Sequence, residues 1–214
     1  MILEAAERRF AAGGQGAVRV QVVAQDVGLT DAAVHYHFGS RKGLLTALLR
    51  YAGRGLRAQI EAAARHWSSG ARDLISLTEL ISDCYDSRGY AHLATWLMLS
   101  GARGRGAGML SALVDAFQRD AGRAARDLGV APRTRKEMQF IVALFHMIQV
   151  AEPLFGEAMR RSAGLTSDGT SRDEFRAWLL SVFENLLHPN ASSDVASDHK
   201  HAGSRDSQPR RVSK

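Results

Sequence analysis

Apolar residues along this chain recur at spacings of three and four, which is the repeat of an α-helix that buries one face. Runs of alternating apolar and polar residues, the pattern of a half-buried strand, are nearly absent. The first apolar stripe contains Leu3, Ala6 and Phe10 and ends at Gly13 and Gly14. The chain is therefore expected to be all-α. The pattern predicts further helices over 20–27, 31–38, 41–67, 71–86, 90–100, 108–128, 133–160 and 172–187.

The predicted helices change in length near residue 45, and this change divides the chain into two parts. We expect a small three-helix head over 1–45 and a larger helical body over 46–188. From Pro189 the chain is rich in Ser, Asp and His and has few apolar residues. Such a segment buries too little apolar surface to offset its ordering entropy, so we expect residues 189–214 to be disordered.

The short segment Gly28-Leu29-Thr30 separates the second and third predicted helices. Thr30 is a good helix N-cap, and Asp31 places a negative charge at the positive end of the helix that follows. Gly28 stands where the end of a helix favours a residue in the left-handed conformation. The segment is therefore predicted to be a tight turn, and the two helices around it to form a helix-turn-helix.

The helix that follows this turn has two different faces. Val34 and Phe38 lie four residues apart on an apolar face with His37 beside them, and we expect all three to pack inward. The opposite face carries His35 and Tyr36, with small side chains at its N-terminal end. Small side chains let a helix approach the major groove of DNA, and the two rings would reach phosphates or bases. On these residues alone, a helical hairpin that binds no DNA remains an alternative.

The stretch GLTDAAVHYHFGSRKGLL, with ILEAAERRF upstream of it, resembles the DNA-binding head of the tetracycline-repressor (TetR) family. In two places the sequence departs from the family pattern. His35 stands where the family usually has a tyrosine that contacts DNA, and Asp31 where a lysine or glutamine is frequent. These departures bear on the DNA sequence that is read and not on the fold. The matching positions are Ala5, Ala6, Phe10, Val23, Ala24, Gly28, Leu29, Thr30, Val34, His37, Phe38, Arg41 and Leu44.

The resemblance implies a homodimeric, ligand-responsive transcriptional repressor. Its two heads would bind a palindromic operator on double-stranded DNA, and a small, mostly apolar effector in the body would release it. The resemblance also places Arg19 near phosphate and Gln21 near base edges, while Arg41, just past the helix-turn-helix, is expected to hold a phosphate. The full set expected at the DNA is Arg19, Gln21, Thr30, Asp31, Ala32, Ala33, His35, Tyr36 and Arg41.

The last predicted helix has a wider apolar stripe than one neighbouring helix needs. Similar proteins pair their last two helices with those of a second subunit in a four-helix interface. Part of the stripe must serve the chain's own core, and the preceding helix, 133–160, is apolar on more than one face. The residues expected at the dimer interface are Phe175, Trp178, Leu179, Val182, Phe183 and Leu186.

A candidate effector pocket is expected among the aromatic, methionine and polar side chains of the body. Methionines and aromatic residues at helical spacing more often belong to a core than to a ligand site. His146 and Gln149 are polar residues in the most apolar helix, so each either orients a ligand or makes a core hydrogen bond. The candidate pocket residues are Trp96, Phe117, Met138, His146, Met147 and Gln149.

The net charge of +6 and the pI of about 10 favour a polyanionic partner but say nothing about the fold. His35 and His37 are two residues apart, so a helix would point them about 200° apart and they would not share a metal ion. The run GARGRGAGM at 101–109 lacks the Gly-Lys-Ser/Thr ending of a phosphate loop, and we interpret it as a helix connection. We expect no metal and no cofactor.

The single cysteine, Cys84, excludes an internal disulfide framework and fits a reducing compartment. No apolar run approaches the ~20 residues of a membrane span, so we expect a cytoplasmic protein without a membrane partner. No serine triad or catalytic carboxylate pair is found, and an enzyme is not expected. Two alternatives remain: a helical interaction protein whose head no longer binds DNA, favoured by Asp31 and His35, and a small helical enzyme using His146 and Glu152.

Overall fold

The structure of the chain is a computed structural model that describes residues 1–68, 71–101, 108–166 and 169–188. Every regular element in these ranges is helical and none is a strand, which confirms the all-α prediction. The predicted tail, 189–214, and most of the connection expected at 101–109 lie outside the described residues. The elements are α1 (Ile2–Ala17), α2 (Val20–Asp26), α3 (Asp31–Phe38), α4 (Arg41–Arg65), α5 (Ala71–Ser82), the π-helical turn η1 (Asp83–Ser87), α6 (Tyr90–Leu99), α7 (Ser111–Leu128), α8 (Arg135–Ser162) and α9 (Gly169–Leu187).

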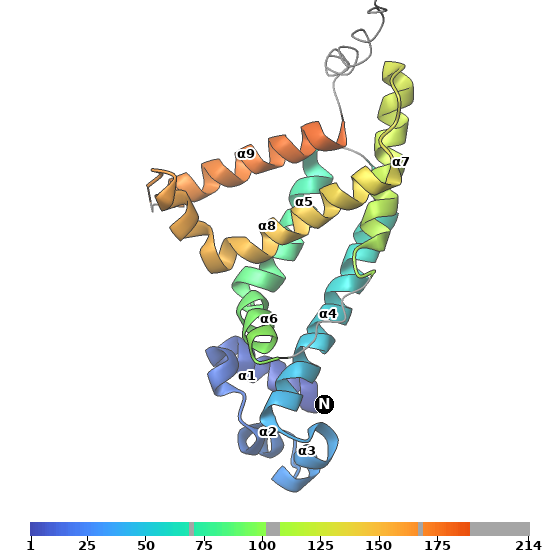
Figure 1. The fold of residues 1–214 in the computed structure, drawn as a ribbon. Helices are drawn as coiled ribbons and strands as arrows, with labels where there is room; N and C mark the ends of the chain where they lie inside the picture. Colours follow the sequence, from blue (N-terminus) through green and yellow to red (C-terminus); the bar gives the residue numbers. More distant parts are fainter. Residues whose placement is uncertain (69–70, 102–107, 167–168, 189–214) are drawn as a thin grey trace, which may run out of the picture.

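The long helix α4 joins the two ends of the molecule (Figure 1). Helices α1, α2 and α3 gather around its N-terminal end and form the head, while its C-terminal part packs against α7 in the body. Helices α8 and α9 form a hairpin that crosses the body and extends away from α7 (Figure 1). Because α4 continues through residue 45, the boundary expected there falls inside a helix that both parts share.

A small apolar core holds the head together. Its residues occupy the positions that the three-and-four spacing predicts for the inner faces. Helix α1 is kinked after its first three turns, since Gly13 and Gly14 have non-helical backbone angles, and this kink is where the sequence predicts the helix to end. The fully buried or nearly buried side chains of this core are Ala5, Ala6, Phe10, Val23, Ala24, Val34, Leu44, Leu45 and Leu48.

The corner between α3 and α4 is too tight for a side chain at Gly43. A Cβ atom built on Gly43 would lie 1.9 Å from the carbonyl oxygen of Phe38. The Ser40 hydroxyl caps α4 by accepting a hydrogen bond from the Gly43 amide at 3.1 Å. Gly39, with φ of 72°, supplies the left-handed residue that ends α3. This corner fixes the direction of α3 relative to α4.

A second connection between head and body involves the segment that follows η1. Glu7 of α1 forms an ion pair with Arg88 and accepts a hydrogen bond from the Tyr90 hydroxyl at 3.0 Å. The rings of Phe10 and Tyr90 stack with their centroids 5.0 Å apart. Burial, together with the neighbouring Glu7 carboxylate, raises the pKa of the Tyr90 hydroxyl, which therefore stays protonated and donates. Helix α1 is thus held by the body as well as by α4.

Buried charges tie α9 to α8 near the proline of α8. The Glu152 carboxylate lies 2.6 Å from Arg160 and 3.3 Å from Arg172, and the side chains of Glu152 and Arg160 are only 10% and 8% exposed. A Cβ atom on Gly156 would lie 2.1 Å from that carboxylate, so a side chain there would displace the Glu152 carboxylate from its present position. Arg172 also pairs with Asp86 of η1. Because breaking a buried pair strands a charge, this network fixes how α8, α9 and η1 meet.

Candidate nucleic-acid interface

The turn between α2 and α3 has the geometry that its sequence predicts. Gly28 has φ of 68°, and the Leu29 amide donates to the carbonyl of Ala24 at 2.9 Å, which ends α2. The Thr30 hydroxyl accepts from the Ala33 amide at 3.2 Å and caps α3. The helix-turn-helix prediction is confirmed at the level of the backbone.

The predicted outer face of α3 is exposed along its length. Ala32, His35 and Tyr36 are all in the exposed class, and Tyr36 is 88% exposed. An aromatic side chain this exposed gains almost nothing from burial, so its position is not explained by folding. His35 Nδ1 also lies 3.3 Å from the carbonyl oxygen of Gly39, which helps to satisfy the C-terminal end of α3.

The residues that flank this face lie around it in the head. Arg19 and Gln21, at the start of α2, are exposed, as is Thr30. Asp31 and Ala33 are half-buried at the first turn of α3. Helix α3 therefore presents small side chains at its N-terminal end and the rings of His35 and Tyr36 further along. The guanidinium of Arg19 and the amide of Gln21 lie at the start of α2, beside it.

Arg41 has a structural role that the sequence did not predict. Its Nε donates to the carbonyl of Val18 at 2.8 Å, and Nη2 donates to the carbonyl of Gln15. These bonds satisfy carbonyl groups at the end of α1, and the side chain is half-buried. The arginine that was expected to hold a phosphate is therefore already engaged in joining α1 to α4.

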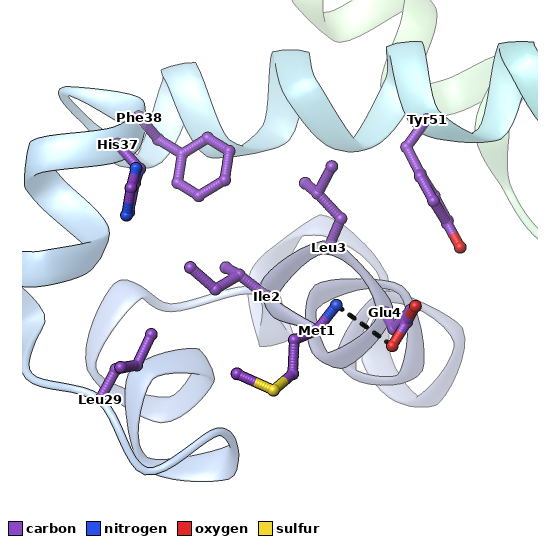
Figure 2. Close-up of a pocket in the computed structure, with 8 residues that line it drawn as sticks. All are labelled: Met1, Ile2, Leu3, Glu4, Leu29, His37, Phe38 and Tyr51. Atoms are coloured by element: carbon purple, nitrogen blue, oxygen red, sulfur yellow. Dashed lines mark ion pairs between the residues drawn. The ribbon is translucent and has the colours of Figure 1, made fainter.

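The prediction that His37 packs inward is wrong, because its side chain is exposed. Helix α3 ends one residue later and the chain turns away at Gly39, so no element covers this position. Figure 2 shows the His37 ring beside Phe38 at the edge of a shallow groove of about 560 Å³. Leu29 and Ile2 line the same groove. Of the three residues expected inside, Val34 is fully buried and Phe38 partly buried.

An ion pair that sequence reasoning missed clamps α1 against α2. Arg9 reaches both carboxylate oxygens of Asp26, with Nε at 2.7 Å and Nη2 at 2.5 Å. The hydrogen bond from this guanidinium lowers the pKa of the Asp26 carboxyl group. The two residues are 17 positions apart, and helical spacing relates only residues within one helix, so the sequence offered no signal for the pair.

A capped helix-turn-helix whose second helix exposes a polar and aromatic face defines the chain as a helix-turn-helix DNA-binding protein. Residues 2–48 match the family model described as "Bacterial regulatory proteins, tetR family". The head therefore carries a TetR-type DNA-binding domain, as its resemblance predicts, and this domain indicates a DNA-binding transcriptional regulator. The match spans the head and the first turns of α4. A search of curated proteins finds no significant match to the chain.

The candidate pocket residues of the body differ widely in burial. Met138 and Phe117 are buried core residues, at 0% and 1% exposure. Met147 is 61% exposed and faces outward, so its assignment to an internal pocket is wrong. Trp96 and Gln149 are half-buried. None of these side chains lines the groove of the head or the cavity between α1, α4 and Arg88.

His146 is the one member of this group with a distinctive polar partner. Its Nε2 lies 2.6 Å from the hydroxyl of Tyr85 in η1. Burial lowers the pKa of His146, which keeps the imidazole neutral, and burial raises the pKa of Tyr85. Next to Tyr85, burial also raises the pKa of the Cys84 thiol to about 11, so this cysteine is an unreactive core residue. Within the described residues no group of three or more His, Cys, Asp or Glu side chains is placed to hold a metal ion.

The residues expected at the dimer interface divide between core and surface. Phe183 is 3% exposed, and its ring packs against that of Phe145 of its own chain with the centroids 5.1 Å apart, so it is a core residue of the single chain. Trp178 is 58% exposed and lies on the outside of α9. Phe175, Leu179, Val182 and Leu186 are half-buried.

Helix α8 carries an exposed apolar face that the expected interface did not include. By length and composition alone, this helix is long enough and apolar enough to cross a membrane. Only 22% of its most apolar 18-residue stretch is buried within the chain. One such helix is weak evidence for a membrane protein. The exposed apolar residues recur at helical spacing along one face of α8 and are Phe140, Leu144, Met147, Phe155 and Met159.

Proposed function

We propose that the chain is a repressor that binds double-stranded DNA as a homodimer and is released by a small effector. The main observation behind the proposal is that the exposed face of α3 combines Ala32 with His35 and Tyr36. A helix with a small side chain near its start can enter the major groove closely, and the two rings then lie against base edges or phosphates.

Contacts to the DNA backbone are proposed for residues beside α3. Arg19 supplies a charged donor to phosphate, and Gln21 offers an amide to a base edge. Thr30, Asp31 and Ala33 lie at the first turn of α3, close to the groove. Because an acid beside phosphate is unfavourable, Asp31 is proposed to accept from a cytosine amino group. Arg41 is left out of this set, since it bonds to carbonyl groups of its own chain.

The homodimer is proposed to form through the outer face of α8 together with Trp178 of α9. Three of the apolar side chains on this surface, Phe140, Met147 and Met159, are more than 60% exposed in the single chain. A contiguous apolar surface of this kind is costly in water and typical of an interaction site. Two copies related by a two-fold axis would place their heads at half-sites of a palindrome, about 34–36 Å apart.

The effector is proposed to act in the body near the Tyr85–His146 pair. Two observations support this position: the pair is a half-buried polar contact between η1 and α8, and η1 leads directly to Arg88, which holds Glu7 of the head. A mostly apolar ligand that replaced the Tyr85–His146 bond would shift η1, and with it α1. Coupling of this kind typically changes DNA affinity by about 5–150-fold.

The proposed role does not need chemistry, since TetR-family regulators act by binding DNA. Glu152, which the enzyme alternative would use beside His146, is engaged by Arg160 and Arg172. A regulator of this family acts where the chromosome is, so we propose a cytoplasmic location. The other alternative, a head that binds no DNA, is favoured by Asp31 and His35 and is separated from our proposal by experiment.

The test of the proposal is selection of bound fragments from genomic DNA with the purified full chain. Enriched fragments that share an inverted repeat support a repressor with a palindromic operator. Recovered fragments without a common sequence, at physiological salt, would favour the interaction protein. The genes beside the recovered sites then supply candidate effectors, and a thermal-shift screen with those compounds tests release from the DNA.

A further inference from the structure

A cavity of about 410 Å³ lies where the head meets the body, and its lining includes neither residues of α3 nor the Tyr85–His146 pair. Its volume falls in the lower part of the range of ligand sites, which is roughly 300–1,000 Å³. One wall belongs to α4 and the other to α1 and to the segment after η1. The side chains and backbone that matter for its chemistry are those of Glu7, Tyr51, Arg54, Gly55, Gln59 and Arg88.

The cavity exists because α4 has no side chain at Gly55. Tyr51, Gly55 and Gln59 are four residues apart from one another, so they follow one face of the helix. A Cβ atom built on Gly55 would meet no other atom within 4 Å. Glycine is unfavourable inside a helix, and neither a turn nor a close contact requires it here. Tyr51 and Gln59 thus lie one helical turn before and one turn after Gly55, where the cavity wall has no side chain.

The cavity has an excess of positive charge. It is lined by two guanidinium groups, of Arg54 and Arg88, and by one carboxylate, of Glu7. Arg88 is paired with Glu7 through one of its terminal nitrogens. Arg54 is exposed, and within the described part of the chain it makes no ion pair. At least one guanidinium fork is therefore open to an anion.

We propose that this cavity binds a small aromatic carboxylate. The guanidinium fork of Arg54 matches the planar, bidentate geometry of a carboxylate, and Arg88 adds a second donor. The Tyr51 side chain offers an aromatic face to the ring of the ligand, which occupies the space above Gly55. The Gln59 amide provides a further donor on the other side of the floor.

The same geometry sets the carboxylate of the ligand against that of Glu7. Both compete for Arg88, and the negative charge of Glu7 disfavours a second anion nearby. Removal of that charge in Glu7→Gln is therefore expected to tighten binding of the carboxylate. The glutamine oxygen still accepts from the Tyr90 hydroxyl, so the contact between α1 and the body is kept in part.

The experiment is calorimetric titration of the full chain with benzoate, with benzylamine as a cationic probe of similar shape. Benzoate is expected to bind with a dissociation constant in the millimolar range or below, and benzylamine is expected not to bind. Arg54→Gln should weaken benzoate binding by about 10-fold, because a charge-assisted pair is lost. Arg50→Gln is the matched control, since Arg50 is an exposed arginine of α4 that does not line the cavity, and it should change affinity by less than about 2-fold.

Gly55→Leu separates loss of the cavity from loss of the fold. A leucine side chain would occupy the cavity, so benzoate binding should disappear. Leucine also favours a helix more than glycine does, so the melting temperature should be unchanged or higher. The proposal is overturned if benzoate does not bind, if Arg54→Gln and Arg50→Gln weaken it equally, or if Gly55→Leu binds it like the parent. Weaker binding by Glu7→Gln than by the parent would also contradict it.

Discussion

At the scale of single residues, Tyr36 is the side chain whose position is best explained by an external partner. It is 88% exposed, so Tyr36→Ala should leave the melting temperature unchanged. Loss of its contact should weaken binding to recovered DNA by about 10-fold or more, since single contacts in such interfaces contribute about 1–3 kcal/mol. Fluorescence anisotropy measures the change. Met98→Ala, which truncates a 66% exposed side chain of α6, is the control and should bind like the parent.

Gly43 shows how a single missing side chain sets the shape of the head. Gly43→Ala should destabilise the protein by roughly 1–3 kcal/mol or more, because its Cβ would overlap the Phe38 carbonyl oxygen at 1.9 Å. Urea unfolding measures the difference. Gly53→Ala on the same helix meets no atom within 4 Å and should stabilise by about 0.5–1 kcal/mol. Equal effects of the two substitutions would show that the corner is not tight.

At the scale of helices, the order of elements and the helix-turn-helix could be predicted because both depend on local signals. Apolar spacing marks a helix, and Gly28 and Thr30 mark its ends by backbone geometry and capping. The π-helical turn η1 has no such signal, since its residues continue the periodicity of α5. The prediction for His37 failed for a similar reason. Helical spacing tells which face of α3 a residue occupies, but not whether another element covers that face at the end of the helix.

The expected dimer surface depends on information that periodicity does not carry. Periodicity reveals that α8 and α9 are apolar on broad faces, but it does not say which face meets the same chain. Phe183 turned out to pack on Phe145, while Met147, expected inside, is exposed. Likewise, the sequence predicts that Arg41 holds a phosphate and gives no sign of its actual partners, because these are backbone carbonyl groups, which every residue has.

Met147 and Phe183 offer a matched pair of substitutions, one on the exposed apolar face of α8 and one in the buried core. Met147→Glu should yield a folded monomer, because the charge lies at the proposed interface and remains in water in the single chain. Phe183→Glu should instead unfold the protein, because it buries a charge in the core. Light scattering reports the mass and circular dichroism the fold. A Met147→Glu protein with the parental mass would remove α8 from the interface.

The Arg9–Asp26 pair links α1 to α2 and makes the head sensitive to acid. The pKa of Asp26 is lowered in the folded state, so the pair stabilises the fold above the usual pKa of aspartate, about 4, and this stabilisation is lost as the pH falls through the lowered value. Arg9→Gln should therefore unfold more easily at neutral pH, with a smaller difference from the parent in strong acid. Thermal melts across this pH range test the sign. A difference that grows towards low pH would contradict it.

At the scale of the whole molecule, helix α4 and the contacts of Glu7 link the DNA-binding face to the body. Helix α4 runs through both parts (Figure 1). Glu7 joins α1 to Arg88 and Tyr90 beside η1. The same turn reaches α8 through Tyr85 and α9 through Asp86. A change at the outer helices therefore has a direct physical route to the head, through one short element. This arrangement is what a ligand-controlled regulator needs, and it rests on pairs that no local sequence pattern predicts.

Two copies of this chain are proposed to bind one inverted repeat through α3. The most direct measurement is titration of the full chain into a duplex that carries the recovered repeat, with mass determined by light scattering and affinity by anisotropy. We expect two chains on each duplex and binding at least about 1,000-fold tighter than to unrelated DNA of the same length at physiological salt. Equal affinity for the repeat and for unrelated DNA, or a single chain on the full repeat, would contradict it.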